Sequence, residues 1–415
     1  MTEDIVNFCK EVKAMQVKIF TLVARGNVHN NYGAVLQAYA LQRYIANMGI
    51  DSEYIDYNGV PQSRRKKMKD LFREFRRKNL VDKLRVSMRY IIRSKLSTHR
   101  ARTFERFKTE YIKFSERSYR SELEIREHES DITKDSILLV GSDQVWNCNL
   151  PVMTLEALKV YLLTFTKEAP KISYASSVAT PIRKELRDLY KEALSDFCAI
   201  SVREVSSANY LEEATGIRPE VVLDPTCLLP VSAWEELVYG VKTDISSTTS
   251  YIFSYELLRS HEILDVIWMW SKKQKVYLVH YIPTLRSFIS KRKSFCYYTS
   301  GPKEFVRLIH DASFVITSSF HGTVFAVIFK KPFYAVLPST GHMNVSNERI
   351  IDFLKMLNLE SRIIADPRQI LSMPLDDCIN WEEVHQILER ERQRSAKFLR
   401  NAIDSALKAK GMNDR

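Results

Sequence analysis

Short apolar runs of strand length alternate with stretches of helical spacing along most of the chain. The first run, VKIFTLVA from residue 17, is followed by a polar loop, the helical stretch AVLQAYALQRYIANM and the strand-like DSEYIDY. Gly49 is expected to end this helix, because glycine commonly follows the last helical turn. The pattern predicts a β-α-β unit at the N-terminus.

Further strand-like runs follow in the first half of the chain. They are SILLVG (136–141), KISYASS (171–177), AISVRE (199–204) and EVVLDP (220–225). Helical patterns such as PIRKELRDLYKEALSDF lie between some of them. Strands that alternate with helices favour a mostly parallel sheet covered on both faces.

A polar stretch, residues 241–250, separates this series from a second one. There the strand-like runs YIFSYEL, KVYLVHY, SFVITS and PFYAVLP alternate with helical stretches. We therefore expect an α/β protein with two Rossmann-like, doubly wound domains facing a cleft, at residues 1–240 and 241–415, the second ending in a long helix. Ligands of such sheets bind beyond the carboxyl ends of the strands, so the loops that follow strands should carry the site.

Composition agrees with a folded protein of this size. The chain has 415 residues, of which 45% are hydrophobic and 27% charged, enough for two cores. We expect a cytoplasmic protein, because the N-terminus lacks an apolar signal stretch and the apolar runs are too short to span a bilayer. The cysteines show no C-x-x-C pair, which argues against structural zinc and a disulfide framework and predicts reduced thiols. They are Cys9, Cys148, Cys198, Cys227, Cys296 and Cys378.

Positive charge is concentrated in one segment. Residues 61–120 hold 21 Lys or Arg against 6 Asp or Glu, whereas the whole chain has a net charge of +12. Apolar residues recur there at helical spacing between the cations, which predicts a basic amphipathic helix within an insertion at about residues 61–126. These apolar residues are Leu80, Val81, Leu84, Met88, Ile91 and Ile92.

Three interpretations of the basic insertion stay open. It is a solvated helical insertion whose arginines pair with acids elsewhere, a helix drawn to an anionic membrane surface, or a nucleic-acid-binding arm. No nucleic-acid partner is expected, because the segment lacks a docking motif and the rest of the chain is slightly acidic.

The turn SSFHG joins the strand-like SFVITS to the apolar helical run VFAVIF. Ser318 or Ser319 is the expected N-cap, and His321 lies in or just before the first helical turn, facing the crevice. The backbone amides of Gly322 and Thr323 are expected to be unpaired and to favour an anion. His321 is therefore suited to binding an acidic ligand and to moving a proton, unless it only caps the helix or fills a polar niche.

The loop after the first strand offers groups suited to a hydroxyl-rich ligand. Asn30, Asn31 and Tyr32 can form neutral hydrogen bonds, and Gly33 permits a close approach of the backbone. The loop lacks the glycine spacing of a dinucleotide fingerprint or a P-loop. Neither NAD nor ATP is expected there.

Two further strand ends carry polar groups. In GSDQVWN (141–147), Asp143, Gln144 and Trp146 form a mixture found where sugars stack and hydrogen-bond, although an Asx-turn with a packed tryptophan is an equal alternative. Arg203, which precedes Glu204, can fork onto a carboxylate or phosphate, or it can form a salt bridge within the protein.

The chain resembles the polysaccharide pyruvyl transferase family through seven motifs in order: NNYGAVLQAYALQRYI, LVGSDQVWN, ISYASS, ISVRE, VLDPTCLL, FVITSSFHGTVFAVIFKKPF and NERIIDFLKMLNL. The resemblance covers nearly the whole chain except the basic insertion and the C-terminal helix. It implies a glycosyltransferase-B-like pair of Rossmann-type domains. It also implies transfer of pyruvate from phosphoenolpyruvate onto sugar hydroxyls as a ketal, without a metal or another cofactor.

The resemblance also implies roles for individual residues. His321 corresponds to a catalytic histidine that binds phosphoenolpyruvate, and Arg203 to an arginine that holds its anionic groups. Many members have an aspartate at the position of Ser318, and Asp224 is a distant alternative for an acid that orients His321. The remaining donor residues are expected on the C-terminal domain: Ser319, Gly322, Thr323, Arg349 and Lys331.

The leading hypothesis is thus a pyruvyl transferase of polysaccharide or exopolysaccharide synthesis, with a glycan or lipid-linked sugar as acceptor. The N-terminal domain is the expected acceptor side. Residues 61–120 could hold the enzyme at the inner face of the cytoplasmic membrane. The alternatives are a nucleotide-sugar-dependent glycosyltransferase on the same fold and a non-enzymatic basic membrane-binding protein.

Overall fold

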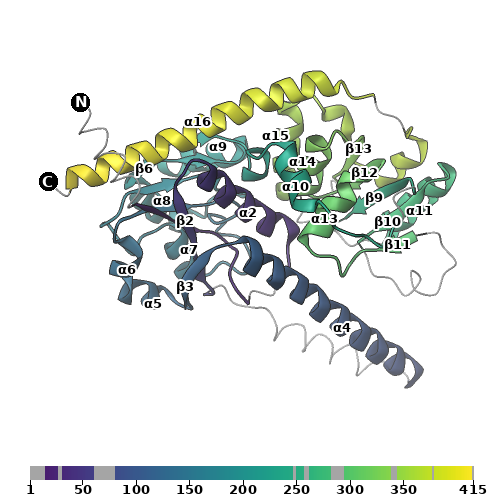
Figure 1. Ribbon diagram of the computed structural model, residues 1–415, viewed down its shortest axis with the longest axis horizontal. Coiled ribbons are helices and arrows are strands. Elements are labelled where there is room, and N and C mark those ends of the chain that lie inside the picture. Colours follow the sequence, from purple (N-terminus) through teal and green to yellow (C-terminus); the bar gives the residue numbers. More distant parts are fainter. Residues whose placement is uncertain are drawn as a thin grey trace.

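The computed structural model (Figure 1) describes most of the chain. The described residues are 15–26, 30–59, 80–245, 249–256, 261–281, 294–337, 344–375 and 378–413. Within helices, the side chains of residues 80–94, 261, 344–346 and 411–413 lie outside this description. The predicted amphipathic positions from Leu80 to Ile92 and the cations of residues 60–79 therefore lie outside the described side chains.

A parallel sheet of six strands forms the first half of the fold, in the order β3-β2-β1-β4-β5-β6. Its strands are β1 (Gln16–Phe20), β2 (Asp51–Tyr57), β3 (Phe114–Tyr119), β4 (Ser136–Val140), β5 (Lys171–Ser173) and β6 (Phe197–Ala199). Every residue of β4 is buried, as expected for a central strand covered by helices on both faces. The predicted parallel sheet is confirmed.

Helices connect these strands. They are α2 (Tyr32–Asn47), α4 (Leu80–Tyr111), α5 (Glu122–Glu127), α6 (Glu129–Thr133), α7 (Leu155–Tyr161), α8 (Arg187–Ser195) and α9 (Val205–Thr215). The side chains of Asn31 and Thr154 accept hydrogen bonds from backbone amides in the first turns of α2 and α7. Such caps satisfy amides that a helix leaves unpaired, so the sequence sets where these helices begin.

The chain departs from the expected strand pattern after β6. Of the predicted strands AISVRE and EVVLDP, only Ala199, at the end of β6, belongs to the large sheet. Instead β7 (Ser201–Val202) and β8 (Glu220–Val221) pair with each other in a separate two-stranded sheet. Arg203 directly follows β7, and Asp224 lies three residues after the end of β8, so this small sheet brings the two residues together.

A second parallel sheet of six strands has the order β11-β10-β9-β12-β13-β14. Its strands are β9 (Tyr251–Tyr255), β10 (Tyr277–His280), β11 (Ser294–Cys296), β12 (Phe314–Thr317), β13 (Phe333–Val336) and β14 (Ile363–Ile364). The helices of this half are α10 (Val231–Val238), α11 (His261–Lys273), α13 (Pro302–His310), α14 (Phe320–Ile328) and α15 (Asn344–Met356). The two sheets make a pair of Rossmann-like domains, as predicted.

The two strand orders define one crevice in each domain. The chain reverses direction across the sheet between β1 and β4, and again between β9 and β12. Ligands of doubly wound sheets bind beyond the carboxyl ends of the strands at such reversal points. The loops that follow these four strands are therefore the first place to look for a site.

Aromatic side chains join the two domains. Trp234 of α10 contacts Tyr39 of α2 at 5.7 Å and Phe325 of α14 at 4.8 Å between ring centroids. Tyr32 of the first domain stacks on Phe305 of the second at 4.1 Å. This packing brings the N-terminal ends of α2 and α14 toward each other.

The last helix, α16 (Trp381–Asn413), runs along both domains (Figure 1). His385 Nε2 lies 2.9 Å from the carbonyl of Val327 in the second domain. Further along, the hydroxyl of Ser395 accepts a hydrogen bond from the amide of Leu223 in the first half of the chain. The predicted long C-terminal helix is present, while the division at residue 240 stays a prediction.

The helix α4 extends away from the two sheets (Figure 1). Its C-terminal half packs into the fold, where Arg100, Phe104 and Phe107 are buried. The chain then adds β3 as an edge strand beside β2. The fold thus incorporates residues 100–119 of the predicted insertion.

Two further expectations concern the cysteines and the membrane. Cys148 and Cys227 are buried, and none of the five cysteines in the described part of the chain forms a disulfide. Cys9 lies outside the described residues. Among the helices that the structure describes, none combines the length and hydrophobicity needed to cross a bilayer.

Candidate active site

His321 lies in the first turn of α14, where its ring meets the other domain. Ser319 is the N-cap of this helix, and its hydroxyl accepts a hydrogen bond from the amide of Gly322. The ring of His321 packs directly on Gly33 of α2, because a Cβ atom at Gly33 would stand only 2.0 Å from Nδ1. His321 is 7% exposed. The predicted place of His321 at the start of this helix is confirmed.

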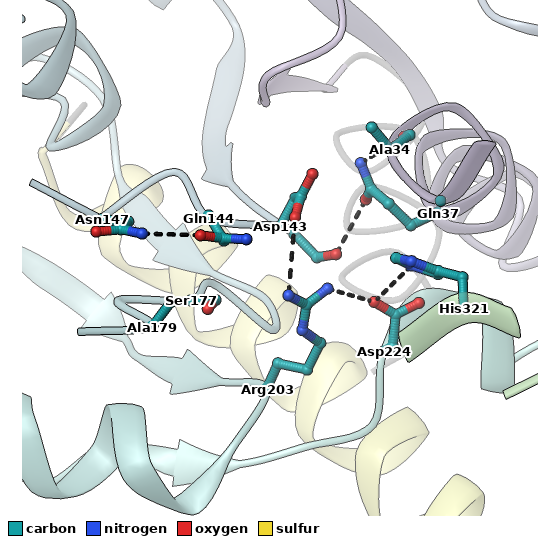
Figure 2. A network of polar contacts seen from close by, with 12 residues as sticks. Ala34, Gln37, Asp143, Gln144, Asn147, Ser177, Ala179, Arg203, Asp224 and His321 are labelled. Atoms are coloured by element: carbon teal, nitrogen blue, oxygen red, sulfur yellow. Dashed lines mark hydrogen bonds and ion pairs between the residues drawn. The ribbon is translucent and has the colours of Figure 1, made fainter. Parts of the chain in front are cut away.

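Asp224 lies between His321 and Arg203, as Figure 2 shows. Its Oδ2 atom is 2.9 Å from Nη1 of Arg203 and 3.5 Å from Nε2 of His321. The other oxygen, Oδ1, accepts hydrogen bonds from the amide and the hydroxyl of Thr226. Oδ1 thus stabilises the turn from Asp224 to Thr226. Oδ2 contacts both the guanidinium of Arg203 and the imidazole of His321, which come from different domains.

This arrangement keeps Asp224 ionised. Burial raises its pKa, but the neighbouring His321 and Arg203 lower it more strongly, so the pKa of Asp224 lies well below the usual range. A carboxylate that stays charged next to imidazole orients the ring and stabilises the imidazolium form. Asp224, which the sequence offered only as a distant alternative, is the acid that contacts His321.

Arg203 is surrounded by carboxylates. Its Nε atom lies 3.4 Å from Glu204 Oε2 and its Nη2 atom 3.7 Å from Asp143 Oδ1, in addition to the contact with Asp224. Burial lowers the pKa of Arg203, but these three acids outweigh that effect and raise it above the usual range. Its guanidinium also lies over the ring of Phe320, 4.8 Å from the centroid. Arg203 is therefore permanently charged and held in one position.

Arg349 of α15 is the second cation near this cluster. Burial is the main cause that lowers its pKa, and repulsion by Arg203 adds to it, while Glu204 and Asp143 oppose the change. The two guanidinium groups therefore repel each other. Two adjacent cations form a site suited to a ligand with several negative charges.

Two nitrogens of the cluster lack a well-formed hydrogen bond. Within the described part of the chain, neither Nη2 of Arg203 nor Nε2 of His321 has a hydrogen-bond partner, although both are buried. Their nearest carboxylate contacts, at 3.7 and 3.5 Å, are longer than a hydrogen bond between charged groups. Buried donors of this kind usually mark a place where water or a ligand binds.

The loop from 141 to 147 reaches the cluster through Asp143. Gln144 is half-buried, and its side-chain oxygen accepts a hydrogen bond from Asn147. Trp146 is fully buried, donates a hydrogen bond to the carbonyl of Tyr161 and packs against Phe197. The prediction that Trp146 stacks on a sugar is therefore wrong, because the core of the first domain encloses its indole.

The side chain of Tyr32 is also enclosed by other parts of the protein. Besides stacking on Phe305, its hydroxyl donates to the carbonyl of Ser300 and accepts a hydrogen bond of 2.6 Å from Arg100. Asn30 also contributes its carbonyl to Arg100, and Asn31 caps α2 with its side chain. Tyr32 thus joins the domains, and its hydroxyl is occupied, which contradicts the prediction that it binds an acceptor.

The helix end that carries His321 offers fewer free amides than expected. The amide of Thr323 donates to the carbonyl of Ser319, and that of Gly322 donates to the Ser319 hydroxyl. Lys331 lies past the C-terminal end of α14, where Asp311 is the charge that acts on it. The predicted anion contacts of the Gly322 and Thr323 amides are wrong, and the structure does not bring Lys331 to the cluster.

Across the residues that the structure describes, no group of three or more His, Cys, Asp or Glu side chains is placed to hold a metal ion. The cations and the imidazole of the cluster are suited to bind an organic anion and to move protons.

Residues 31–340 match the sequence profile of the polysaccharide pyruvyl transferases, which covers most of the chain. The chain belongs to this family. It is accordingly a transferase, and the cluster around Asp224 is the candidate active site of a pyruvyl transferase. No curated protein matches the sequence.

Solved structures show the same two-domain fold. UDP-N-acetylglucosamine 2-epimerase from Rickettsia bellii superposes with a TM-score of 0.51 at 9% identity, covering 95% of this chain and 97% of that chain. S. aureus TarM, solved as a mutant with Fondaparinux, alpha-GlcNAc-glycerol and UDP, gives 0.50 at 9% identity, with 94% and 99% coverage. Trehalose-phosphate synthase from Burkholderia vietnamiensis gives 0.50 at 10% identity, with 95% and 99% coverage. The pyruvyl transferase therefore has the predicted glycosyltransferase-B-like fold.

Sequence reasoning missed several residues of this pyruvyl transferase site. Glu204 accepts hydrogen bonds from Ser177 and Ser207 besides contacting Arg203. Gln37 accepts a hydrogen bond of 3.0 Å from the hydroxyl of Ser142, next to Asp143. The one available signal was position, since Glu204 directly follows Arg203 at a strand end and Gln37 lies one helical turn after Gly33.

Proposed function

We propose that this protein transfers pyruvate from phosphoenolpyruvate onto two hydroxyls of a sugar, forming a ketal and releasing phosphate. The observation that carries the proposal is the sharing of Asp224 Oδ2 between Arg203 and His321. It couples a group that can bind an anion to a group that can move a proton, and this reaction needs both.

The donor would lie against the two arginines. Phosphoenolpyruvate carries a carboxylate and a phosphate on the same carbon, so it presents several anionic oxygens at short range. Nη2 of Arg203 and the guanidinium of Arg349 are the candidate partners for these oxygens. The ion pairs of Arg203 with Asp224 and Glu204 would keep its guanidinium group in a fixed orientation.

The acceptor hydroxyl would lose its proton to His321. Nε2 faces Asp224, whose carboxylate would stabilise the imidazolium that forms when the ring takes this proton. Nδ1 points at Gly33 in the first domain, which is the proposed acceptor side. Without a side chain at Gly33, the first domain comes close to this nitrogen.

The other polar groups of the first domain complete the proposed acceptor site. Gln144 is half-buried, Asn31 is exposed, and Asp143 is buried beside Arg203. Amide and carboxylate groups of this kind hydrogen-bond to sugar hydroxyls. We propose a glycan or a lipid-linked sugar as the acceptor, with the basic segment at residues 61–120 as a contact to an anionic membrane surface.

A donor comparison tests the proposal. Thermal unfolding would be followed with phosphoenolpyruvate and, separately, with UDP-sugars, because a ligand that binds the folded state raises the melting temperature. The proposal predicts stabilisation by phosphoenolpyruvate that depends on Arg349. Stabilisation by UDP-sugars alone would favour a nucleotide-sugar-dependent glycosyltransferase.

A further inference from the structure

The crevice of the second domain contains a carboxyl group that the proposed mechanism has not used. The strand order of this domain reverses between β9 and β12. Glu256 directly follows β9, and Ser318 directly follows β12. The amide of Ser318 donates to the carbonyl of Tyr255 at 3.2 Å, so the two strand ends lie side by side at the reversal point.

This place is next to the candidate active site. Ser318 is followed by Ser319, the N-cap of α14, and His321 lies in the first turn of the same helix. Glu256 therefore borders the crevice of the second domain, which is the proposed donor side. Crevices at reversal points of parallel sheets are the usual ligand sites of this architecture.

Glu256 is buried and poorly compensated. It is 1% exposed, and neither carboxylate oxygen has a well-formed hydrogen bond within the described residues. Burial raises its pKa to about 8, and the polar side chain of Ser318 reduces this rise. A buried carboxyl without a counter-charge is stable mainly as the neutral acid.

Other titratable groups lie on the elements around this strand end. His280 ends β10, Glu262 and Asp265 lie in the first two turns of α11, and His321 lies on α14. Among the described residues, no charge on these elements contributes to the shift of Glu256; its causes are burial and Ser318. Glu256 is thus distinct from Asp224, which neighbouring positive charges keep ionised.

We propose that Glu256 is the general acid that protonates the methylene carbon of the donor. This inference rests on the proposed function and adds a second catalytic residue to it. A neutral carboxylic acid can deliver a proton to carbon, whereas an ionised carboxylate cannot. The two catalytic groups would then divide the work, with Glu256 as the acid on the donor side and His321 as the base on the acceptor side.

The step balances as follows. The Oε–H bond of Glu256 breaks, and the electron pair of the donor's carbon–carbon double bond takes the proton, which turns the methylene into a methyl group and leaves the adjacent carbon cationic. The first sugar hydroxyl adds to that carbon, and His321 takes its proton. The carbon–oxygen bond to phosphate then breaks, and the second hydroxyl closes the ketal. One of the two hydroxyl protons restores Glu256, and the other leaves with the phosphate.

The first test compares Glu256→Gln with the wild type across pH 6 to 10. The wild type should lose transfer activity as pH rises through about 8, where Glu256 gives up its proton. Glu256→Gln should transfer about 10²- to 10⁴-fold more slowly, without this alkaline decline, and should still be stabilised by phosphoenolpyruvate. Near wild-type turnover in Glu256→Gln, or an unchanged alkaline decline at reduced rate, would overturn the inference. A wild type without any phosphoenolpyruvate-dependent transfer would instead refute the proposed function.

A second variant keeps the inference testable if Glu256→Gln does not fold. Ser318→Ala removes the side-chain hydroxyl that lowers the pKa of Glu256, so the alkaline decline should move to higher pH. A decline that stays in place, or moves to lower pH, would contradict the inference.

Protein stability gives a readout that is independent of catalysis. The folded state holds the Glu256 proton up to about pH 8, whereas the unfolded chain releases it near the ordinary value of 4.5. The free energy of unfolding of the wild type should therefore fall as pH rises through this window. The contribution of Glu256 to this fall should be absent in Glu256→Gln. Parallel curves for the two proteins would refute the protonated state on which the inference depends.

Discussion

Gly33 of the first domain lies against the ring of His321 in the second, at a distance that leaves no room for a side chain. A Cβ atom at Gly33 would stand 2.0 Å from Nδ1 and 2.5 Å from Cε1 of the ring. On its other edge the ring faces Asp224 through Nε2. The position of the imidazole is therefore fixed from both sides, by a glycine of one domain and a carboxylate that follows β8.

Gly33→Ala should displace His321 and reduce transfer strongly. Alanine is a better helix former than glycine by about 1 kcal/mol, so α2 itself should not be weakened. The loss would come from the contact with His321, either through movement of the ring or through separation of the domains. Kinetics and denaturant unfolding of the single variants Gly33→Ala and His321→Ala, and of the double variant, separate the two effects.

The double variant is the control for this prediction. His321→Ala removes the ring that the new methyl group would meet, so Gly33→Ala should cost less stability in that background than alone. Equal costs in both backgrounds would mean that Gly33 is needed for another reason.

Asp224→Asn should impair both neighbours of Asp224 at once. Removing one partner of a buried ion pair leaves the other charge uncompensated and costs about 3–5 kcal/mol. The pKa of Asp224 is lowered in the folded state, so its contribution to stability is present above the ordinary value of 3.8 and is lost as pH falls below it. The stability gap between the wild type and Asp224→Asn, measured by denaturant unfolding, should therefore be wide at pH 7 and narrow toward pH 3. A gap independent of pH would show that Asp224 does not act through its charge.

The sequence predicted the parts of this site that depend on local structure. His321 follows an N-capping serine after an apolar strand, and such a pattern places a side chain at a helix start whatever surrounds it. The predictions that were wrong concern side chains whose partners are distant in the sequence. Tyr32 is taken up by Phe305 and Arg100, and Trp146 by Tyr161 and Phe197. No local sequence pattern predicts these partners.

Two other outcomes have the same kind of cause. Lys331 is only ten residues from His321 in sequence, but α14 lies between them and carries Lys331 to the opposite end of the helix. Asp224 is 97 residues from His321, and only the pairing of β7 with β8 and the packing of the two domains bring them together. Distance along the chain was therefore a poor guide for both residues. Lys331 is near His321 in sequence but lies away from it in the fold, whereas Asp224 is distant in sequence but contacts it.

Arg349→Gln should weaken donor binding more than it affects the fold. Its guanidinium lies near Arg203, and a lost hydrogen bond to a charged group costs about 1.5–3 kcal/mol, roughly a tenfold to a hundredfold rise in the donor Kd. Arg368→Gln is a matched control, because Arg368 is an exposed arginine that pairs with Asp366. Calorimetry with phosphoenolpyruvate would measure both; equal affinities for the two variants would remove Arg349 from the donor site.

The basic segment should bind anionic membranes. Each Lys or Arg near an anionic surface contributes about 1 kcal/mol, and residues 61–120 carry 21 of them, of which Arg100 and Lys108 are buried in the fold. Co-sedimentation with anionic vesicles should exceed that with neutral vesicles and should weaken as salt is raised, because salt screens the attraction. Equal binding to both vesicle types, or none at low salt, would leave the segment as a solvated insertion or a protein contact surface.

The most direct test of the central claim follows the donor carbon into the product. The protein would be incubated with phosphoenolpyruvate labelled with ¹³C at its methylene carbon and with a panel of glycan and lipid-linked sugar acceptors, and the glycans would be examined by NMR. The account predicts a labelled methyl group in a ketal on the sugar, one phosphate released for each ketal formed, and no product from His321→Ala above a rate about 10²- to 10⁴-fold lower. Sugar transfer from a UDP-sugar to the same acceptors, with no label entering them from phosphoenolpyruvate, would contradict it.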